Sequence, residues 1–211
     1  MLIIYIFEKN YALQKKKEGT MKTIKEEVAN EIVIKNSRFI TIFFSLEDKN
    51  IAPILEEVRK KYPKANHYCY AYIYEKEKGF SDDGEPSKTA GMPMLNVLEK
   101  EELTNILGVT VRYFGGIKLG AGGLVRAYTK SFTDALQKAS LVSLYEAYKI
   151  RITFPYSDEK QINYLLQDAN ILKREYQDFT IYTTVIEKEK MSLLDHYSYE
   201  ILEECLIKKD S

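Results

Sequence analysis

The residues best suited to chemistry in this 211-residue sequence lie in a glycine-rich stretch, residues 112–126. Half of the ten glycines in the chain stand within it, and they are Gly115, Gly116, Gly120, Gly122 and Gly123. Core packing does not explain this density, because glycine adds no side chain and costs backbone entropy. Glycines gather where φ is positive or where another group approaches the backbone closely. We therefore expect a loop that holds a ligand.

Charge and position make an anion the expected ligand of this loop. It lies between a predicted strand, residues 105–114, and a predicted helix, residues 124–140, so free N–H groups of the helix's first turn point into it. Residues 105–140 contain five bases and one acid, a local charge of +4. Three of the bases flank the glycines, and they are Arg112, Lys118 and Arg126. The alternative is a turn that only lets the strand and the helix pack closely.

The usual nucleotide-binding motifs do not match this loop. A P-loop needs Gly-Lys followed by Ser or Thr, which is absent here. The run Gly120-Ala-Gly122-Gly-Leu-Val125 begins like the dinucleotide motif but has Val125 in the place of its third glycine. The sequence therefore does not support nucleotide hydrolysis or dinucleotide chemistry, and we expect no cofactor.

A second cluster with chemical potential is the acidic loop Asp82, Asp83 and Glu85. Three carboxylates in four residues suit a magnesium or calcium site, or a general acid/base pair. The alternative is a solvated turn, because Asp, Gly and Pro are themselves turn formers. Residues 75–102 contain eight acids and four bases, a charge of −4. A third reading is that this segment faces the basic glycine loop and holds it through salt bridges, which would be structure and not catalysis.

Residues 67–74 alternate with period two, which predicts a strand with two different faces. His67 and Cys69 share one face and suggest a nucleophile and a base, but no third residue orients the histidine, so a core role is favoured. The other face has a row of tyrosines, Tyr68, Tyr70, Tyr72 and Tyr74. Such a row is a candidate surface for stacking bases. The alternative is a sheet face that packs under a helix.

The remaining elements follow from hydrophobic periodicity and turn residues. We expect two domains with a boundary near residues 141–144. In the first domain the predicted strands are 31–35, 38–46, 67–74 and 105–114, the helices 48–62, 92–102 and 124–140, and the loop 75–86. In the second domain the predicted strands are 147–154, 171–176, 180–188 and 201–207, with helices at 158–169 and from 191. The order of the elements in the second domain, β-α-β-β-α-β, is the ferredoxin-like pattern.

Composition limits the function classes that remain. The chain is 45% hydrophobic and 29% charged, and its 31 basic residues balance its 31 acidic ones. Without a global basic field, any binding of nucleic acid must come from a local patch. The two cysteines form no CxxC pair and the chain has only two histidines, so the sequence does not favour a structural zinc site, and we expect no metal. The longest apolar run, residues 2–7, is too short to cross a bilayer, so we expect a cytoplasmic protein without a membrane partner.

The first twenty residues are predicted not to belong to the folded protein. The run Lys15-Lys-Lys-Glu-Gly-Thr20 precedes Met21, and its codons can spell a ribosome-binding sequence in front of a start codon. We therefore interpret residues 1–20 as a leader or a mis-assigned start, and Met21 as the native first residue.

Several of these motifs together resemble one known family. They are Ser37-Arg-Phe-Ile40, His67, Ala71, Ser81-Asp-Asp-Gly-Glu-Pro86, Thr89-Ala-Gly91-x-Pro93 and Arg112-Tyr-Phe-Gly-Gly-x-Lys-Leu-Gly-x-Gly-Gly-Leu-x-Arg-Ala-Tyr128. The set resembles the IMPACT/YigZ family, strongly over residues 21–140 and by element order beyond them. The resemblance is to the bacterial type, because the chain has no room for the RWD domain of eukaryotic members.

The resemblance implies an α+β fold in two parts. Residues 21–141 would form the N-terminal domain, with a ribosomal-protein-S5 domain 2-like fold. Residues 142–211 would form a ferredoxin-like C-terminal domain, similar to domain V of elongation factor G. The pair is similar to two consecutive domains of that factor, which meet the ribosome. The S5-like fold hosts both RNA binders and kinases, so fold alone does not decide function.

Three function classes follow from the residues and the resemblance. The favoured one is a non-enzymatic protein that associates with RNA or the ribosome, is linked to translation and binds phosphates through the glycine loop. The second is an enzyme that acts on a small phosphorylated substrate and uses the acidic loop as a metal or acid/base site. The third is a protein-interaction module with a partner in translation. The oligomeric state is left open.

Overall fold

The computed structural model describes residues 21–208, so the predicted leader, residues 1–20, lies outside the described residues. The chain divides into two compact units between Val142 and Ser143. Each unit contains both helices and strands, which confirms the mixed class of the predicted fold. Within the described residues, no helix is long and apolar enough to cross a membrane.

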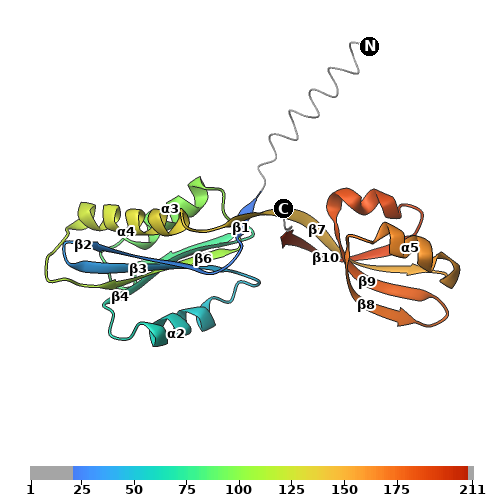
Figure 1. The fold of residues 1–211 in the computed structure, drawn as a ribbon, viewed down its shortest axis with the longest axis horizontal. Coiled ribbons are helices and arrows are strands. Elements are labelled where there is room, and N and C mark those ends of the chain that lie inside the picture. The colour runs from blue at the N-terminus through green and yellow to red at the C-terminus, as the bar shows by residue number, and fades with distance from the viewer. Residues whose placement is uncertain (1–20, 209–211) are drawn as a thin grey trace, which may run out of the picture. The chain divides into compact units, whose positions relative to one another are not determined.

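The first unit is built on a five-stranded antiparallel sheet (Figure 1). Its strand order is β2 (Val28–Ile34), β3 (Ser37–Ser45), β6 (Ile106–Tyr113), β4 (His67–Tyr74) and β5 (Glu77–Ser81). The strands β2 and β3 form a hairpin around Lys35 and Asn36, whose φ angles are 44° and 63°. Two residues of positive φ are what a tight hairpin turn requires, and asparagine tolerates that conformation well.

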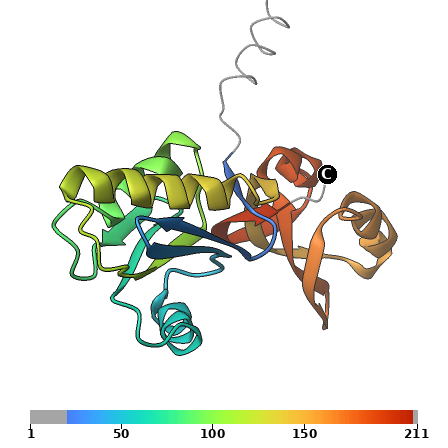
Figure 2. The same ribbon diagram turned by 60° about the vertical axis from the view of Figure 1, so that its left-hand side comes forward.

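Helices cover both faces of this sheet (Figures 1 and 2). Helix α2 (Ala52–Lys61) begins with a proline in its first turn and packs on one face. Helices α3 (Gly91–Lys100) and α4 (Ala121–Leu136) pack on the other face. The alternation in β4 matches this division, because Tyr68 belongs to the core under α2, whereas Cys69 and Ala71 belong to the core under α3 and α4.

Helix α4 is held close to the middle of the sheet. Its buried stripe is Leu124, Ala127, Tyr128, Ser131, Phe132, Ala135 and Leu136, at the spacing of an amphipathic helix. Phe132 lies against Gly108 of β6, where an added Cβ would stand 2.3 Å from the Phe132 ring. The close contact packs α4 against β6, and the helix also lies over β2 and β3. The contact with β6 therefore brings the beginning of α4 next to the end of β6, across one short loop.

The second sheet has five strands, and most of it lies in the second unit, which also has short helices. Its strand order is β1 (Lys22–Ile24), β7 (Leu141–Phe154), β9 (Thr180–Glu187) and β8 (Asn170–Tyr176), and β10 (Ser198–Lys208) also pairs with β7. Between the strands lie the 3-10 helix η1 (Tyr156–Asp158), α5 (Glu159–Leu165) and the 3-10 helix η2 (Lys188–Leu194). Its core centres on Ile150, Ile152, Phe154, Ile162 and Tyr182. In the first unit, β1 (Lys22–Ile24) precedes Lys25, whose N–H donates to the Ser140 carbonyl at 2.8 Å.

Several elements differ from the sequence prediction, among them β1, which was not predicted, and β7, which begins at Leu141 and not at residue 147. The predicted loop 75–86 contains strand β5, a polar strand that pairs only with β4 at the sheet edge. An edge strand pairs with a neighbour on one side only and needs few apolar residues. The alternation of apolar and polar residues that predicts a strand is therefore weak in β5. The helix predicted from residue 191 is η2, which ends at Leu194. Strand β10, the last predicted strand, is present and longer than expected.

Candidate anion-binding site

The glycine loop connects the end of β6 to the first residue of α4, and the fold itself favours glycine at three of its positions. At Gly115 an added Cβ would lie 2.1 Å from the carbonyl carbon of Asn36, in the β2–β3 turn. At Gly120 the backbone has φ 71° and ψ 165°, a conformation that is essentially restricted to glycine. Gly116 also has a positive φ, of 84°. The alternative of a turn without a ligand therefore accounts for these three positions.

The first turn of α4 is not capped by a side chain. Its N-cap is Gly120, which has no side chain to offer, and the Leu124 N–H makes the first helical bond to the Gly120 carbonyl at 2.9 Å. By helix geometry the N–H groups of residues 121–123 have no acceptor inside the helix. At Gly122 an added Cβ would first meet Arg126 Nη1 at 3.7 Å, so packing does not exclude a larger residue there. The glycine leaves free space beside three N–H donors.

Arg112 differs from the expected phosphate ligand, because it is buried and paired. Its side chain is 5% exposed and Nη1 donates to Glu85 Oε1. The same oxygen accepts from the Tyr128 hydroxyl at 2.8 Å, and His67 Nε2 lies 3.8 Å away. A buried guanidinium requires such a partner. The charge of Arg112 is therefore balanced inside the fold by the acidic segment, as the salt-bridge reading predicts.

The other two basic residues of the loop are exposed. Among the described residues, no hydrogen bond or ion pair joins Lys118 or Arg126 to another side chain. Arg126 stands one turn into α4, and its guanidinium lies above Gly122. These two cations flank the uncapped helix start, so a phosphate placed there would meet both charges and the backbone donors.

A cavity of about 370 Å³ opens beside this helix start. Its walls include His67, Glu85, Arg112, Phe114 and Lys118, together with Gly120, Ala121 and Leu124 at the beginning of α4. The structure therefore brings together one buried ion pair, one exposed cation, an aromatic ring and a helix N-terminus. Residues from the sequence-predicted basic loop and from the acidic loop meet at this cavity.

The carboxylates of the acidic loop have structural partners. Asp82 accepts three backbone N–H groups, from Lys88 at 2.7 Å, Ala90 at 3.0 Å and Gly91 at 2.8 Å, and so holds the start of α3. Asp83 accepts from the Tyr68 N–H at 2.6 Å and from Arg59 Nη2 at 3.1 Å. No group of three or more His, Cys, Asp and Glu residues suited to a metal ion occurs within residues 21–208. The contacts of Asp82 and Asp83 in this structure therefore hold the loop and its neighbouring elements in place.

The histidine and cysteine of β4 also have structural partners. Cys69 is fully buried, and its thiol lies 3.0 Å from the Asp82 carbonyl and 3.3 Å from the Tyr128 hydroxyl. Burial raises the pKa of the Cys69 thiol, and burial likewise raises the pKa of Tyr128. A buried neutral thiol is a poor nucleophile, so the core role fits Cys69. His67 Nδ1 donates to the Asp83 carbonyl at 2.8 Å, which leaves Nε2 toward Glu85.

The tyrosine row is not an open stacking surface. Tyr68 is 8% exposed, and Tyr70, Tyr72 and Tyr74 are half-buried against the core that α2 covers. The Tyr68 hydroxyl donates to the Tyr62 carbonyl at 2.6 Å, and Arg59 lies over the Tyr68 ring. These contacts favour the alternative reading, a sheet face packed under a helix, over a base-stacking row.

Comparison with known proteins confirms the family that the motifs suggested. The Impact N-terminal domain matches residues 35–136. IMPACT family member YvyE of Bacillus subtilis (strain 168) is 35% identical over 185 residues, which are 85% of this chain and 85% of that protein. The chain belongs to the IMPACT family. IMPACT family member YigZ of Escherichia coli (strain K12) is 35% identical over 75% of this chain and 82% of its own length.

A solved structure shares the fold of this chain. A crystal structure described as a hypothetical protein superposes with a TM-score of 0.68 at 32% identity. The match covers 87% of this chain and 97% of that one. It therefore extends beyond the Impact N-terminal domain into the second unit.

Sequence reasoning assigned no site role to two residues of this candidate site, Phe114 and Tyr128. Phe114 is 44% exposed at the end of β6, and its position next to two glycines is the signal that could have identified it. Tyr128 belongs to the predicted apolar stripe of α4, but its hydroxyl reaches Glu85. Nothing in the sequence links Tyr128 to residue 85, because the contact depends on how the helix sits on the sheet.

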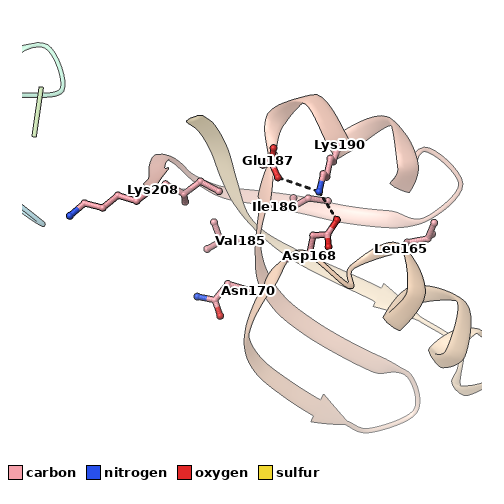
Figure 3. Close-up of a pocket in the computed structure, with 10 residues that line it drawn as sticks. Leu165, Asp168, Asn170, Val185, Ile186, Glu187, Lys190 and Lys208 are labelled. Atoms are coloured by element: carbon pink, nitrogen blue, oxygen red, sulfur yellow. Dashed lines mark hydrogen bonds and ion pairs between the residues drawn. The ribbon is translucent and has the colours of Figure 1, made fainter. Parts of the chain in front are cut away.

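The second unit has a smaller cavity, of about 290 Å³, between β9 and the end of α5 (Figure 3). Its central cation, Lys190, lies 2.9 Å from Asp168 Oδ2 and 3.2 Å from Glu187 Oε1 (Figure 3). With two carboxylates beside it, this lysine offers no free positive charge to an anion. The cavity beside α4 therefore has the better claim to be the binding site.

Proposed function

We propose that this IMPACT-family chain is a protein associated with RNA or the ribosome and linked to translation, and that it holds phosphates of the RNA backbone at residues 115–126. The observation that supports this most is the placement of Lys118 and Arg126, both exposed and without a side-chain partner among the described residues, beside the uncapped first turn of α4. The link to translation rests on the family's similarity to ribosome-binding domains of elongation factor G.

The proposed contact reads charge and not base sequence. Backbone N–H groups and cations bind any phosphate, so they position a nucleic acid without selecting its sequence. The chain has no net charge, so affinity depends on this local patch and not on a field from the whole molecule. Binding must then weaken as salt rises, because each neutralised phosphate releases a counterion.

The experiment compares the unmodified chain with Arg126→Ala by titrating a fluorescent single-stranded RNA at several salt concentrations. We expect weaker binding and a slope of log affinity against log salt that is lower by about 0.7, the value for one lost contact to a single strand. The matched control is Lys60→Ala, which removes one exposed positive charge from α2, on the opposite face of the sheet.

The control should leave both affinity and slope within error of the unmodified chain. If Arg126→Ala also leaves both unchanged, the glycine loop is not the phosphate site and the proposal is wrong. If Lys60→Ala lowers them equally, binding reflects total charge and not this loop.

A further inference from the structure

Phe114 is the exposed aromatic ring of the candidate site. It directly follows β6, and its N–H donates to Asn66 Oδ1 at 2.8 Å, which anchors the backbone at this point. Its ring is 44% exposed and lies with its centroid 5.6 Å from the guanidinium carbon of Arg112. One side of the ring is thus supported by a buried cation while part of it faces solvent. An exposed ring with an anchored backbone is suited to stacking against a planar group.

The cavity beside Phe114 has the dimensions and lining of a small-ligand pocket. Its volume of about 370 Å³ falls in the range of about 300–1,000 Å³ that such pockets occupy. Phe114, Leu119 and Leu124 give it an apolar wall, whereas His67, Arg112 and Lys118 give it polar groups. A nucleotide matches this lining, because its planar base can pack on the apolar wall and its phosphate can meet the polar groups.

Arg112 provides an independent observation that favours a ligand in this cavity. It is 4% exposed, yet its Nε has no hydrogen-bond partner within the described part of the chain. Buried polar groups almost always find partners, so an unsatisfied donor in a cavity wall calls for an explanation. An oxygen-rich ligand in the cavity would provide acceptors next to this guanidinium.

Charge complementarity gives the orientation of such a ligand. Lys118 lines the cavity at the side of the helix start, where the N–H groups of residues 121–123 have no acceptor. A phosphate fits at this end, and the attached base then lies toward Phe114. The tyrosine row cannot take this role, because it lies in the core that α2 covers.

We propose that the cavity receives one unpaired nucleotide of an RNA strand, with its base stacked on Phe114 and its phosphate at Lys118 and the start of α4. The inference rests on the proposed function and adds the ligand's form, which is single-stranded RNA and not a duplex. In a duplex each base is stacked and paired with its neighbours, so it is not free to enter the cavity.

The test replaces Phe114 with leucine, which keeps apolar volume and removes the aromatic face, and measures affinity for a ten-nucleotide single strand and for its duplex. We expect Phe114→Leu to weaken single-strand binding about 5- to 150-fold, as the loss of one stacked base does. Duplex affinity and the salt slope should stay unchanged. Phe114→Trp should restore single-strand binding.

The matched control is Ile117→Ala, an apolar residue that is 45% exposed in the same loop and does not line the cavity. It should change neither affinity. If Phe114→Leu leaves single-strand binding unchanged while Arg126→Ala weakens it, the stacking inference fails and the phosphate site stands. If neither variant has an effect, the proposed function fails as well. Equal losses for single strand and duplex also overturn the inference.

Discussion

At the scale of single residues, Glu85 controls how much of the loop's positive charge a ligand can meet. Its side chain is 4% exposed, and one oxygen serves both Arg112 and the Tyr128 hydroxyl. Arg112 is thereby neutralised, whereas Lys118 and Arg126 keep their charges at the surface. The two segments of opposite charge in the sequence thus meet through one buried pair, and the pair forms one wall of the candidate site.

We predict that Glu85→Ala destabilises the fold far more than an exposed acid does. It would leave a buried guanidinium without its counter-charge, which costs about 3–5 kcal/mol in the free energy of unfolding. The control is Glu99→Ala, which removes an exposed pair with Lys78 and should cost at most about 1 kcal/mol. Urea unfolding followed by circular dichroism measures both.

Similar losses for the two variants would contradict the buried-pair account. They would mean that Arg112 reaches solvent when its partner is removed. Glu85 would then contribute no more to the free energy of unfolding than an exposed acid does.

At the scale of elements, the acidic loop holds the start of α3. Ala90, the N-cap of that helix, makes no side-chain cap, and Asp82 accepts the Ala90 and Gly91 N–H groups from outside the helix. A carboxylate at a helix N-terminus is stabilising because it also meets the positive end of the helix dipole. The Asp82 carboxylate therefore stabilises the start of α3 without a metal ion.

We predict that Asp82→Ala lowers the free energy of unfolding by about 0.5–2 kcal/mol, the range for loss of a helix cap. The loss should be the same with and without millimolar Mg²⁺, because both carboxylate oxygens already accept backbone N–H groups. Thermal unfolding of both proteins in matched buffers measures this. Stabilisation of the unmodified chain by Mg²⁺ that Asp82→Ala abolishes would instead support the enzyme alternative.

At the scale of the whole molecule, the proposed site lies within one unit. The two cores that flank the first sheet, the glycine loop and α4 all precede the division between Val142 and Ser143. The second unit has its own core around Ile150 and Tyr182. Each unit therefore has the buried apolar surface that an independently stable domain needs.

We predict that a fragment of residues 21–142 folds and binds single-stranded RNA with the salt slope of the full chain. All of the proposed phosphate and base contacts lie in it. Circular dichroism checks its fold, and titration with the same labelled RNA checks its binding. A fragment of residues 143–211 is the control and should bind at least tenfold more weakly. A folded 21–142 fragment without RNA affinity would show that the second unit contributes contacts.

The sequence by itself determined the features that depend on neighbours along the chain. Periodicity identified both faces of β4 and the buried stripe of α4, and the motifs identified the IMPACT family. Only the tertiary structure decided what each charged or aromatic residue does. Arg112 meets Glu85, 27 positions away, Asp82 reaches α3, and the tyrosines lie under α2. A residue type and its spacing describe what a side chain can do, but its partner and its access to solvent depend on which elements the fold packs against it.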